Sequence, residues 1–104
     1  MEVNNLTDKN YEDIIAATQS GLILFHKKLC PHCLNMKKVI EKFITAKGEG
    51  VSVMYMDSEE NPEGMQSLDV ERVPTLEIIK NGKVASTKSG LMNPRELAVF
   101  FQEA

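Results

Sequence analysis

The chain has 104 residues, a net charge of −3 and 42% hydrophobic residues, as expected for one globular domain with a single core. No segment reaches the ~20 consecutive apolar residues that a membrane-spanning helix needs, and the charge gives no sign of a nucleic-acid or membrane partner. We therefore expect one domain over residues 1–104. The N-terminal stretch is acidic and lacks the apolar core of a signal peptide, which favours a cytoplasmic location.

The first part of the chain predicts a helix followed by a buried strand. The residues before Leu6 are too few to assign. Thr7 is a candidate cap for the first helix, with Leu6 packing against Tyr11, and Gly21 is a candidate end of that helix. Residues 22–26 form a continuous apolar run, which is typical of a central strand covered on both faces.

A long amphipathic helix is predicted from Pro31 to about Ala46. Its apolar residues recur at helical spacing and predict one buried face, made of Cys33, Met36, Ile40, Phe43 and Ile44. Gly48 and Gly50 are expected to break this helix. Residues 51–56 then predict a second strand, which ends at an aspartate.

The last part of the chain predicts a short helix, a hairpin and a final helix. The short helix covers about 62–69, with Met65 and Leu68 on its buried side. A third strand at 76–79 leads into Asn81-Gly82, a strong hairpin turn signal, so residues 83–88 are expected to form its antiparallel partner. A capped helix then starts at Asn93, with Leu97, Phe100 and Phe101 facing inward.

The predicted order is therefore αβαβαββα. Strands joined by helices and followed by a hairpin give a mixed sheet with helices on both faces, so we predict an α/β fold. Cys30 and Cys33 lie where strand 22–26 gives way to the next helix, at the sheet edge where open α/β sheets place their sites.

These are the only two cysteines of the chain, and their setting predicts a redox-active pair. Pro31 suits the first helical position, because its missing N–H would have no intrahelical partner. Cys30 then falls at the N-cap, where free backbone N–H groups and the positive end of the helix dipole stabilise a thiolate. Cys33 lies inside the first turn and is shielded. We expect Cys30 to attack first and Cys33 second.

Two other interpretations of the cysteines remain open at this point. They could be buried small hydrophobes or half of a zinc site. A metal carrier would use Cys30, Cys33, His26 and His32, although His32 points away from the cysteines in a regular helix.

Val73-Pro74-Thr75, just before the third predicted strand, supplies the second part of the candidate site. Proline donates no ladder hydrogen bond and therefore belongs at the start of a strand. We expect Pro74 to be cis and to lie beside Cys30. The exposed edge next to it could pair with an extended substrate segment.

With both motifs in place, the chain resembles the thioredoxin family over nearly its whole length. The resemblance includes the Cys-x-x-Cys that opens the second helix, the Val73-Pro74-Thr75 turn, the hairpin at 80–84 and the segment 87–90. It implies a thiol–disulfide oxidoreductase of thioredoxin fold that acts through a Cys30–Cys33 disulfide. It also implies no bound cofactor, disulfide-containing protein substrates, re-reduction by a thioredoxin-reductase-like flavoprotein, a monomer, and a substrate groove at Leu29, Val73, Pro74, Thr75 and Gly90.

The chain also departs from the usual family pattern. It has no tryptophan, it has His26 where the family often has one, and it has Leu24 where the family has a buried aspartate. The family's lysine on the middle strand has no counterpart between residues 51 and 57. The family usually has Gly-Pro between its cysteines. The Pro31-His32 dipeptide of this chain instead resembles that of the periplasmic disulfide-forming oxidases, whose large helical insert is absent here.

These departures predict a tuned active site. His32, between the two cysteines, is expected to stabilise the Cys30 thiolate. A basic rim would act in the same way, through Lys27, Lys28, Lys37 and Lys38. Stabilising the thiolate favours the reduced form, so we expect a weaker reductant than an ordinary thioredoxin. Without the buried aspartate, His26 is the nearest candidate base for Cys33.

Other redox classes share part of this pattern. A glutaredoxin-like, glutathione-dependent reductase also has Cys-Pro-x-Cys after an apolar strand, but the first predicted helix and the match from Lys80 to Gly90 favour the thioredoxin frame. An oxidase or isomerase that works outside the cytoplasm is a further alternative.

Overall fold

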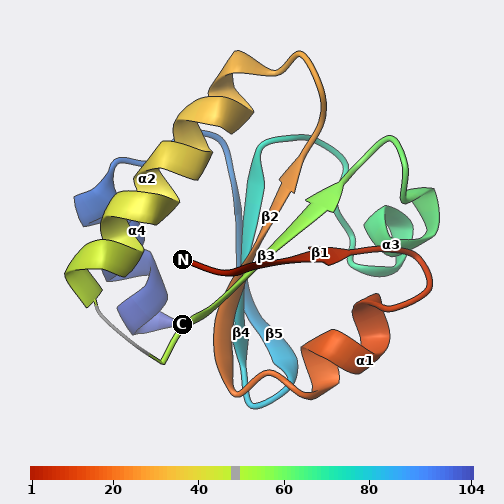
Figure 1. The fold of residues 1–104 in the computed structure, drawn as a ribbon, viewed down its shortest axis with the longest axis horizontal. Coiled ribbons are helices and arrows are strands. Elements are labelled where there is room, and N and C mark those ends of the chain that lie inside the picture. Colours follow the sequence, from red (N-terminus) through yellow and green to blue (C-terminus); the bar gives the residue numbers. More distant parts are fainter. Residues whose placement is uncertain (48–49) are drawn as a thin grey trace.

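A five-stranded mixed sheet with helices on both faces forms the structure, a computed structural model that describes residues 1–47 and 50–104 (Figure 1). This confirms the predicted α/β fold. The elements in chain order are β1 (Val3–Leu6), α1 (Tyr11–Ala16), β2 (Ser20–His26), α2 (Pro31–Lys47), β3 (Ser52–Asp57), α3 (Pro62–Ser67), β4 (Thr75–Lys80), β5 (Lys83–Ser89) and α4 (Pro94–Glu103). No helix among the described residues is long and apolar enough to cross a bilayer.

The strands lie in the order β1-β3-β2-β4-β5, so β2 is central. It pairs in parallel with β3 and antiparallel with β4, and β5 completes the hairpin. Leu22 to Phe25 have no exposed surface, which explains why the strand is apolar throughout rather than alternating. The order predicted from the sequence, αβαβαββα, omitted the first strand. This strand, β1, pairs in parallel with β3, from Val3 opposite Val53 to Leu6 opposite Met56.

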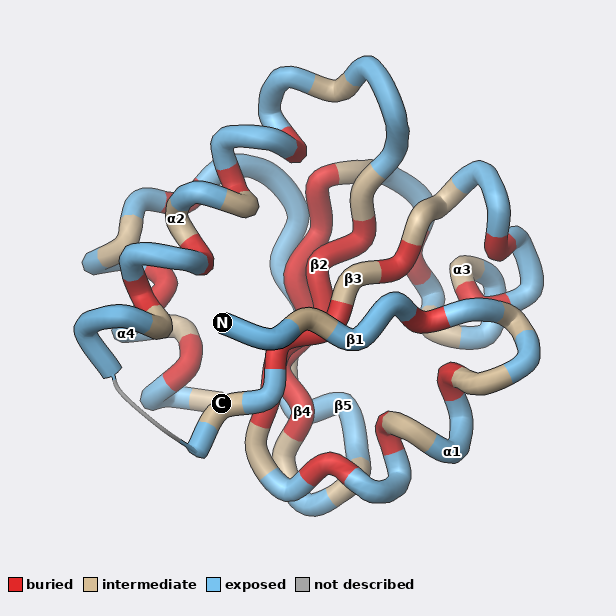
Figure 2. Tube along the Cα trace, viewed as in Figure 1, coloured by how far each residue is buried: buried red, intermediate tan, exposed pale blue. Residues whose placement is uncertain are grey.

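Two apolar cores lie on the two faces of the sheet, because successive side chains of a strand point to opposite sides. Leu22 and Leu24 belong to the core under α2 and α4, whereas Ile23 and Phe25 belong to the core under α1 and α3. Figure 2 shows the buried positions concentrated on the inner strands, and β5 is exposed along most of its length. The buried face predicted for α2 is confirmed, since Cys33, Met36, Ile40 and Phe43 are buried.

The predicted boundaries of the first helix were wrong. Residues 7–10 form a turn in which the Thr7 carbonyl accepts the N–H groups of Asn10 and Tyr11 at 3.2 and 3.0 Å, and α1 begins only at Tyr11. Gly21 does not end this helix but lies in β2. A Cβ there would come within 2.7 Å of the Ser52 carbonyl oxygen, so the glycine permits close approach of two strands. The predicted break at Gly48 falls outside the described residues.

The local signals in the last third of the chain are confirmed. Asn81 and Gly82 both have positive φ, 53° and 78°, as the tight hairpin turn between Lys80 and Lys83 requires. At the start of α4, the Asn93 side chain accepts from the Glu96 N–H at 2.8 Å, and the Glu96 carboxylate accepts from the Asn93 N–H at 3.0 Å. This reciprocal pair satisfies two backbone groups at the helix start.

Glu77 is an acidic residue buried in the middle of β4. It is 1% exposed, and its side chain lies on the α1 and α3 side of the sheet, like that of Ile79. One carboxyl oxygen accepts from the Thr87 hydroxyl at 3.2 Å, and the other has no partner among the described residues. Burial raises the pKa of Glu77 to about 7, with Thr87 opposing the shift and Asp69 adding to it.

We predict that Glu77 makes stability depend on pH. The unfolded chain loses this proton near pH 4.5 and the folded chain near 7, so stability falls across this interval as pH rises and levels off above it. The loss is on the order of 3 kcal/mol. Glu77→Gln should remove this part of the pH dependence, and the exposed control Glu12→Gln should keep it. Urea unfolding at several pH values measures both, and an identical pH dependence in Glu77→Gln would contradict the assignment.

Candidate active site

The two cysteines lie at the start of α2, where the loop from β2 reaches its outermost point. Leu29 is fully exposed with φ 56°, and this left-handed backbone turns the chain into the helix. The Cys30 carbonyl accepts the Leu34 N–H at 3.2 Å and its sulfur accepts the Cys33 N–H at 3.2 Å. Cys30 therefore occupies the N-cap position, with its sulfur against the free amide groups of the first turn.

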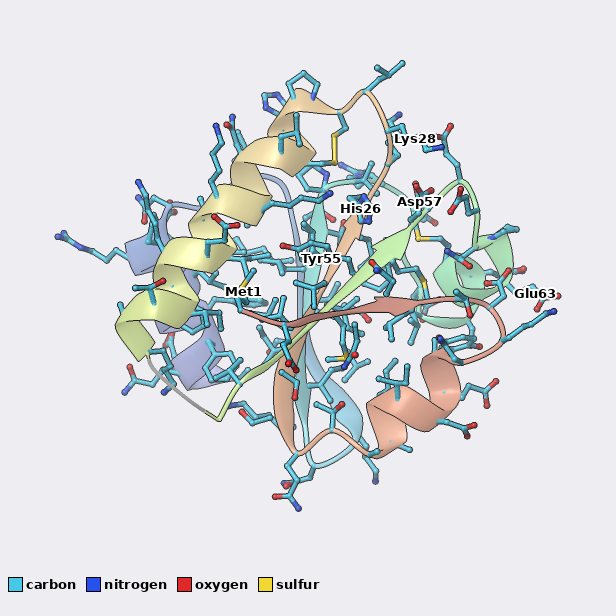
Figure 3. All side chains as sticks on the ribbon, viewed as in Figure 1. Met1, His26, Lys28, Tyr55, Asp57 and Glu63 are labelled. Carbon is cyan, nitrogen blue, oxygen red and sulfur yellow. A yellow bond between two sulfur atoms is a disulfide. The ribbon has the colours of Figure 1, made fainter. Side chains whose placement is uncertain are left out.

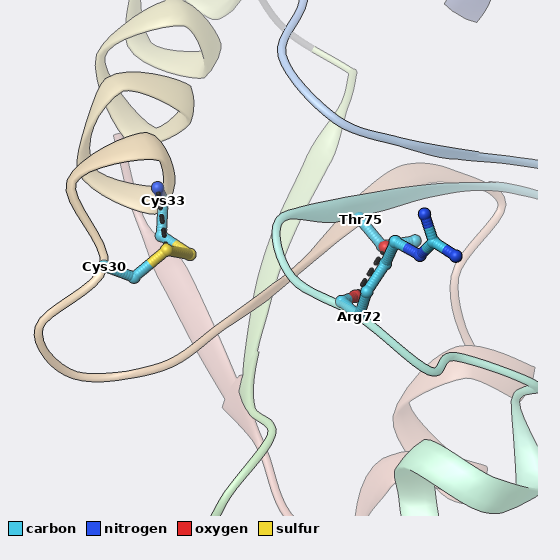
Figure 4. Close-up of a disulfide and its surroundings, with 4 residues drawn as sticks. All are labelled: Cys30, Cys33, Arg72 and Thr75. Carbon is cyan, nitrogen blue, oxygen red and sulfur yellow. Dashed lines mark hydrogen bonds between the residues drawn. A yellow bond between two sulfur atoms is a disulfide. The ribbon is translucent and has the colours of Figure 1, made fainter.

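Cys30 and Cys33 form a disulfide with their Cα atoms 5.2 Å apart (Figure 4). The two sulfurs differ in access: Cys33 is 1% exposed, whereas Cys30 is half-buried. An incoming group can therefore reach Cys30 and not Cys33.

The loop before β4 faces the disulfide from the other side (Figure 4). The Val73–Pro74 peptide bond is cis, as predicted. Thr75 pairs with Phe25 of β2, which brings the start of β4 to the edge where β2 ends. The Gly90 N–H donates to the Pro74 carbonyl at 2.9 Å, so the segment after β5 is held beside the proline. These contacts bring Val73, Pro74, Thr75 and Gly90 together at this edge.

A hollow of about 230 Å³ lies beside the disulfide. Apolar and basic side chains dominate its lining, which consists of His26, Lys27, Lys28, Leu29, Cys30, Cys33, Leu34, Lys37 and Asp57. Leu29 and Leu34 are largely exposed, as is Leu91 after the Gly90 turn. An exposed apolar surface around a reactive sulfur suits contact with another protein.

Comparison with known proteins identifies the family. The sequence model of the family described as Thioredoxin matches residues 2–103. The chain belongs to the thioredoxin family. Thioredoxin of Listeria monocytogenes is 35% identical over 97 residues, which is 91% of each chain. Thioredoxin of Rhodospirillum rubrum is 30% identical over 96 residues, or 91% of this chain and 92% of that one.

Solved structures agree with this assignment. Desulfothioredoxin from Desulfovibrio vulgaris Hildenborough, solved in solution in its reduced form, is 42% identical with a TM-score of 0.86, covering 98% of this chain and 97% of that one. A chain from a study of thiol resolution in a yeast mitochondrial 1-Cys peroxiredoxin shares the fold, with a TM-score of 0.87 at 22% identity over 99% and 96% of the two chains. The chain is thus a thiol–disulfide oxidoreductase. Members of its family reduce protein disulfides and are themselves re-reduced by a reductase.

His26 lies at the end of β2, opposite Asp57 at the end of β3 (Figure 3). Its ring meets the Tyr55 ring edge-on, with centroids 5.7 Å apart, and Lys37 Nζ lies 5.2 Å from the Tyr55 centroid. Burial lowers the pKa of His26, the Lys37 ammonium lowers it further, and Asp57 and Glu60 oppose the shift. The imidazole of this thioredoxin therefore favours its neutral form.

His32 and Pro31 are both exposed on the first turn of α2. His32 lies between the two cysteines in sequence, and it is exposed on the outer surface of the helix. Within residues 1–47 and 50–104, no group of three or more His, Cys, Asp or Glu side chains is arranged to hold a metal ion. The ligand set considered for a metal carrier is therefore not assembled in this structure.

Sequence reasoning missed two side chains that line the hollow, Leu34 and Asp57. Asp57 carried a usable signal, because the carboxyl ends of neighbouring parallel strands meet at one edge of a sheet. Leu34 carried none, since a single leucine on the outer side of a helix is common.

Proposed function

We propose that this thioredoxin reduces disulfides of partner proteins through attack by Cys30, and that its Pro31-His32 dipeptide makes it less reducing than an ordinary thioredoxin. One observation carries the order of attack. The Cys30 sulfur lies at the amide-rich start of α2 and this residue is partly exposed, whereas Cys33 is 1% exposed. Amide groups and the helix dipole stabilise a thiolate at Cys30.

The reaction then runs in two exchange steps. The Cys30 thiolate attacks one sulfur of the substrate disulfide, a mixed disulfide forms, and the other substrate sulfur leaves as a thiolate. Cys33 loses its proton and attacks the Cys30 sulfur, which releases the second substrate thiolate. The substrate gains two electrons, and its two thiolates take up one proton that Cys33 released and one from solvent. The protein is left with the Cys30–Cys33 disulfide.

We predict that Cys33→Ser accumulates mixed disulfides with substrates and that Cys30→Ser does not. Without Cys33 the first step proceeds but the second lacks its nucleophile. Incubation with oxidised insulin, followed by non-reducing electrophoresis and mass spectrometry, measures the adducts. Trapping by Cys30→Ser instead would show that the order of attack is reversed.

The substrate groove is proposed to run between Leu29 on one side and Val73, Pro74, Thr75 and Gly90 on the other. The hydrogen bond from Gly90 to Pro74 supports this set, because it ties the two loops into one wall. Proline has no N–H to offer the Cys30 sulfur, which leaves that sulfur free for exchange. An extended substrate segment would pair with the exposed backbone edge at Val73.

His26 is proposed to accept the proton of Cys33. Both residues line the same hollow, and the lowered pKa of His26 keeps its imidazole neutral and able to accept a proton. Leu24, at the position of the family's buried aspartate, is fully buried and supplies no base.

We predict that the pH dependence of mixed-disulfide resolution follows His26. Lys37→Met removes a cation that lowers the pKa of His26, so the midpoint of the resolution rate should move to higher pH. Lys38→Met, one residue further along α2, should leave it in place. Stopped-flow measurement of substrate release gives the profiles, and an unchanged profile in His26→Ala would exclude His26 as the base.

The Pro31-His32 dipeptide is proposed to raise the reduction potential. Thioredoxin lies near about −270 mV, and the periplasmic oxidase that shares this dipeptide lies near about −120 mV. The frame here is that of a thioredoxin, so an intermediate value is expected. His32 lies within the first turn of α2, where a positive or hydrogen-bond-donating ring favours the Cys30 thiolate over the disulfide.

We predict that His32→Ala lowers the potential by on the order of 20 mV, because an exposed side chain stabilises the thiolate by less than the ~1.4 kcal/mol that corresponds to about 30 mV. Exchanging both residues, Pro31→Gly with His32→Pro, should lower it further and raise the pKa of the Cys30 thiol. Equilibration with a glutathione buffer and thiolate absorbance against pH measure the two quantities. The exposed control Asn35→Ala should change neither, and no change in His32→Ala would remove its proposed role.

The partner proposed to recharge the protein is a flavoprotein reductase, with no cofactor bound to the chain itself. We propose that the protein is a monomer. We also propose that it works in the cytoplasm, because a lone cysteine pair in that compartment more often serves catalysis than structure. Insulin reduction driven by dithiothreitol, and then by candidate flavoprotein reductases, tests the assignment. Turnover with glutathione alone would favour a glutaredoxin-like protein instead.

A further inference from the structure

A second hollow adjoins the redox site on the side of α3. It measures about 520 Å³, and its lining extends from Lys27, which also lines the hollow beside the disulfide, to Val73, the residue before the cis proline. The two hollows are thus neighbours along one surface. We call the larger one the acidic hollow, for the carboxylates on its rim.

Apolar side chains supply part of its lining. Met65 and Val73 are half-buried and Val70 is buried. Glu59 and Glu71 lie on the rim and are exposed. Neither carboxylate makes a side-chain hydrogen bond or ion pair within the part of the chain that the structure describes, so both are available to a partner.

Charge is unevenly distributed around the redox site, although Lys27 also lines the acidic hollow and Asp57 also lines the hollow beside the disulfide. Residues 57–71 contain six carboxylates and no lysine or arginine, whereas residues 27–42 contain five lysines and one glutamate. Lys28 and Glu63, labelled in Figure 3, mark the basic and the acidic segment. A partner that docks from Cys30 toward α3 therefore meets lysines first and then, beyond Lys27, the carboxylates of Glu59 and Glu71.

We propose that the acidic hollow binds a segment of the disulfide partner in which an apolar side chain lies next to lysine or arginine. The apolar side chain would occupy the space above Val70, and the cation would face Glu59 and Glu71. Continuity with the redox site through Lys27 and Val73 makes a protein that already touches Cys30 the occupant. The proposal rests on the proposed function, because the segment belongs to the protein whose disulfide is reduced.

The N-terminus of α3 does not add an anion-binding site to the acidic hollow. Its amide groups at Glu63 and Gly64 are already taken by the Asp8 carboxylate, at 3.4 and 2.7 Å. Among the charged side chains that line the hollow, Glu59 and Glu71 outnumber Lys27, and this excess of negative charge favours a positively charged partner segment.

The test uses pre-reduced protein and two disulfide peptides of equal length, flanked by Leu-Lys-Lys or by Leu-Glu-Glu. The wild-type protein should reach half-maximal rate at about five- to tenfold lower concentration of the basic peptide, as two exposed ion pairs allow. Glu59→Lys with Glu71→Lys should reverse this preference. The control Glu2→Lys with Glu103→Lys changes net charge equally, away from both hollows, and should keep the preference.

The outcomes distinguish a failure of the proposed function from a failure of the docking proposal. If the wild-type protein reduces neither peptide, the proposed function itself fails. If it reduces both with equal half-saturating concentrations, or if the preference survives in Glu59→Lys with Glu71→Lys, the acidic hollow is not a docking site. An equal loss in the Glu2 and Glu103 control would mean that long-range charge, and not the hollow, sets the preference.

Discussion

The antiparallel pairing of β2 with β4 is the constraint on which the active site depends. It sets Phe25 opposite Thr75, so the strand that leads to Cys30 ends where the strand that follows Pro74 begins. Both strands are buried on their two faces, and a slip of one residue would turn every core side chain to the wrong side. The start of α2 and the loop with the cis proline therefore lie at the same edge of the sheet, because two apolar cores hold the register.

Local sequence signals predicted the parts of the fold that neighbouring residues determine. The hairpin turn needs two residues with positive φ, and the start of α4 needs a reciprocal cap. Both could therefore be predicted from a few neighbouring residues. β1 was not readable, because its partner Val53 lies some fifty residues away. Gly21 was misinterpreted for the same reason: it accommodates a carbonyl of the neighbouring strand, and nothing beside it in sequence shows that.

The features of the candidate site also differ in whether neighbouring residues or the folded chain determine them. Cys30, Cys33 and Pro74 were found from motifs whose chemistry depends on short spacing. Outside the site, Glu77 was interpreted as an ordinary strand residue, because its burial depends on which elements cover each face of β4. The electrostatic surroundings of His26 depend on Lys37 and Asp57, which only the folded chain brings near it.

The central claim is that Cys30 provides the accessible, acidic sulfur and Cys33 the shielded one. Alkylation of the reduced protein with limiting iodoacetamide at several pH values, followed by peptide mapping, tests it most directly. The account predicts modification at Cys30 alone at early times, with an apparent pKa below the ~8.5 of a free cysteine. Modification of Cys33 first, or of both at equal rates, would contradict it.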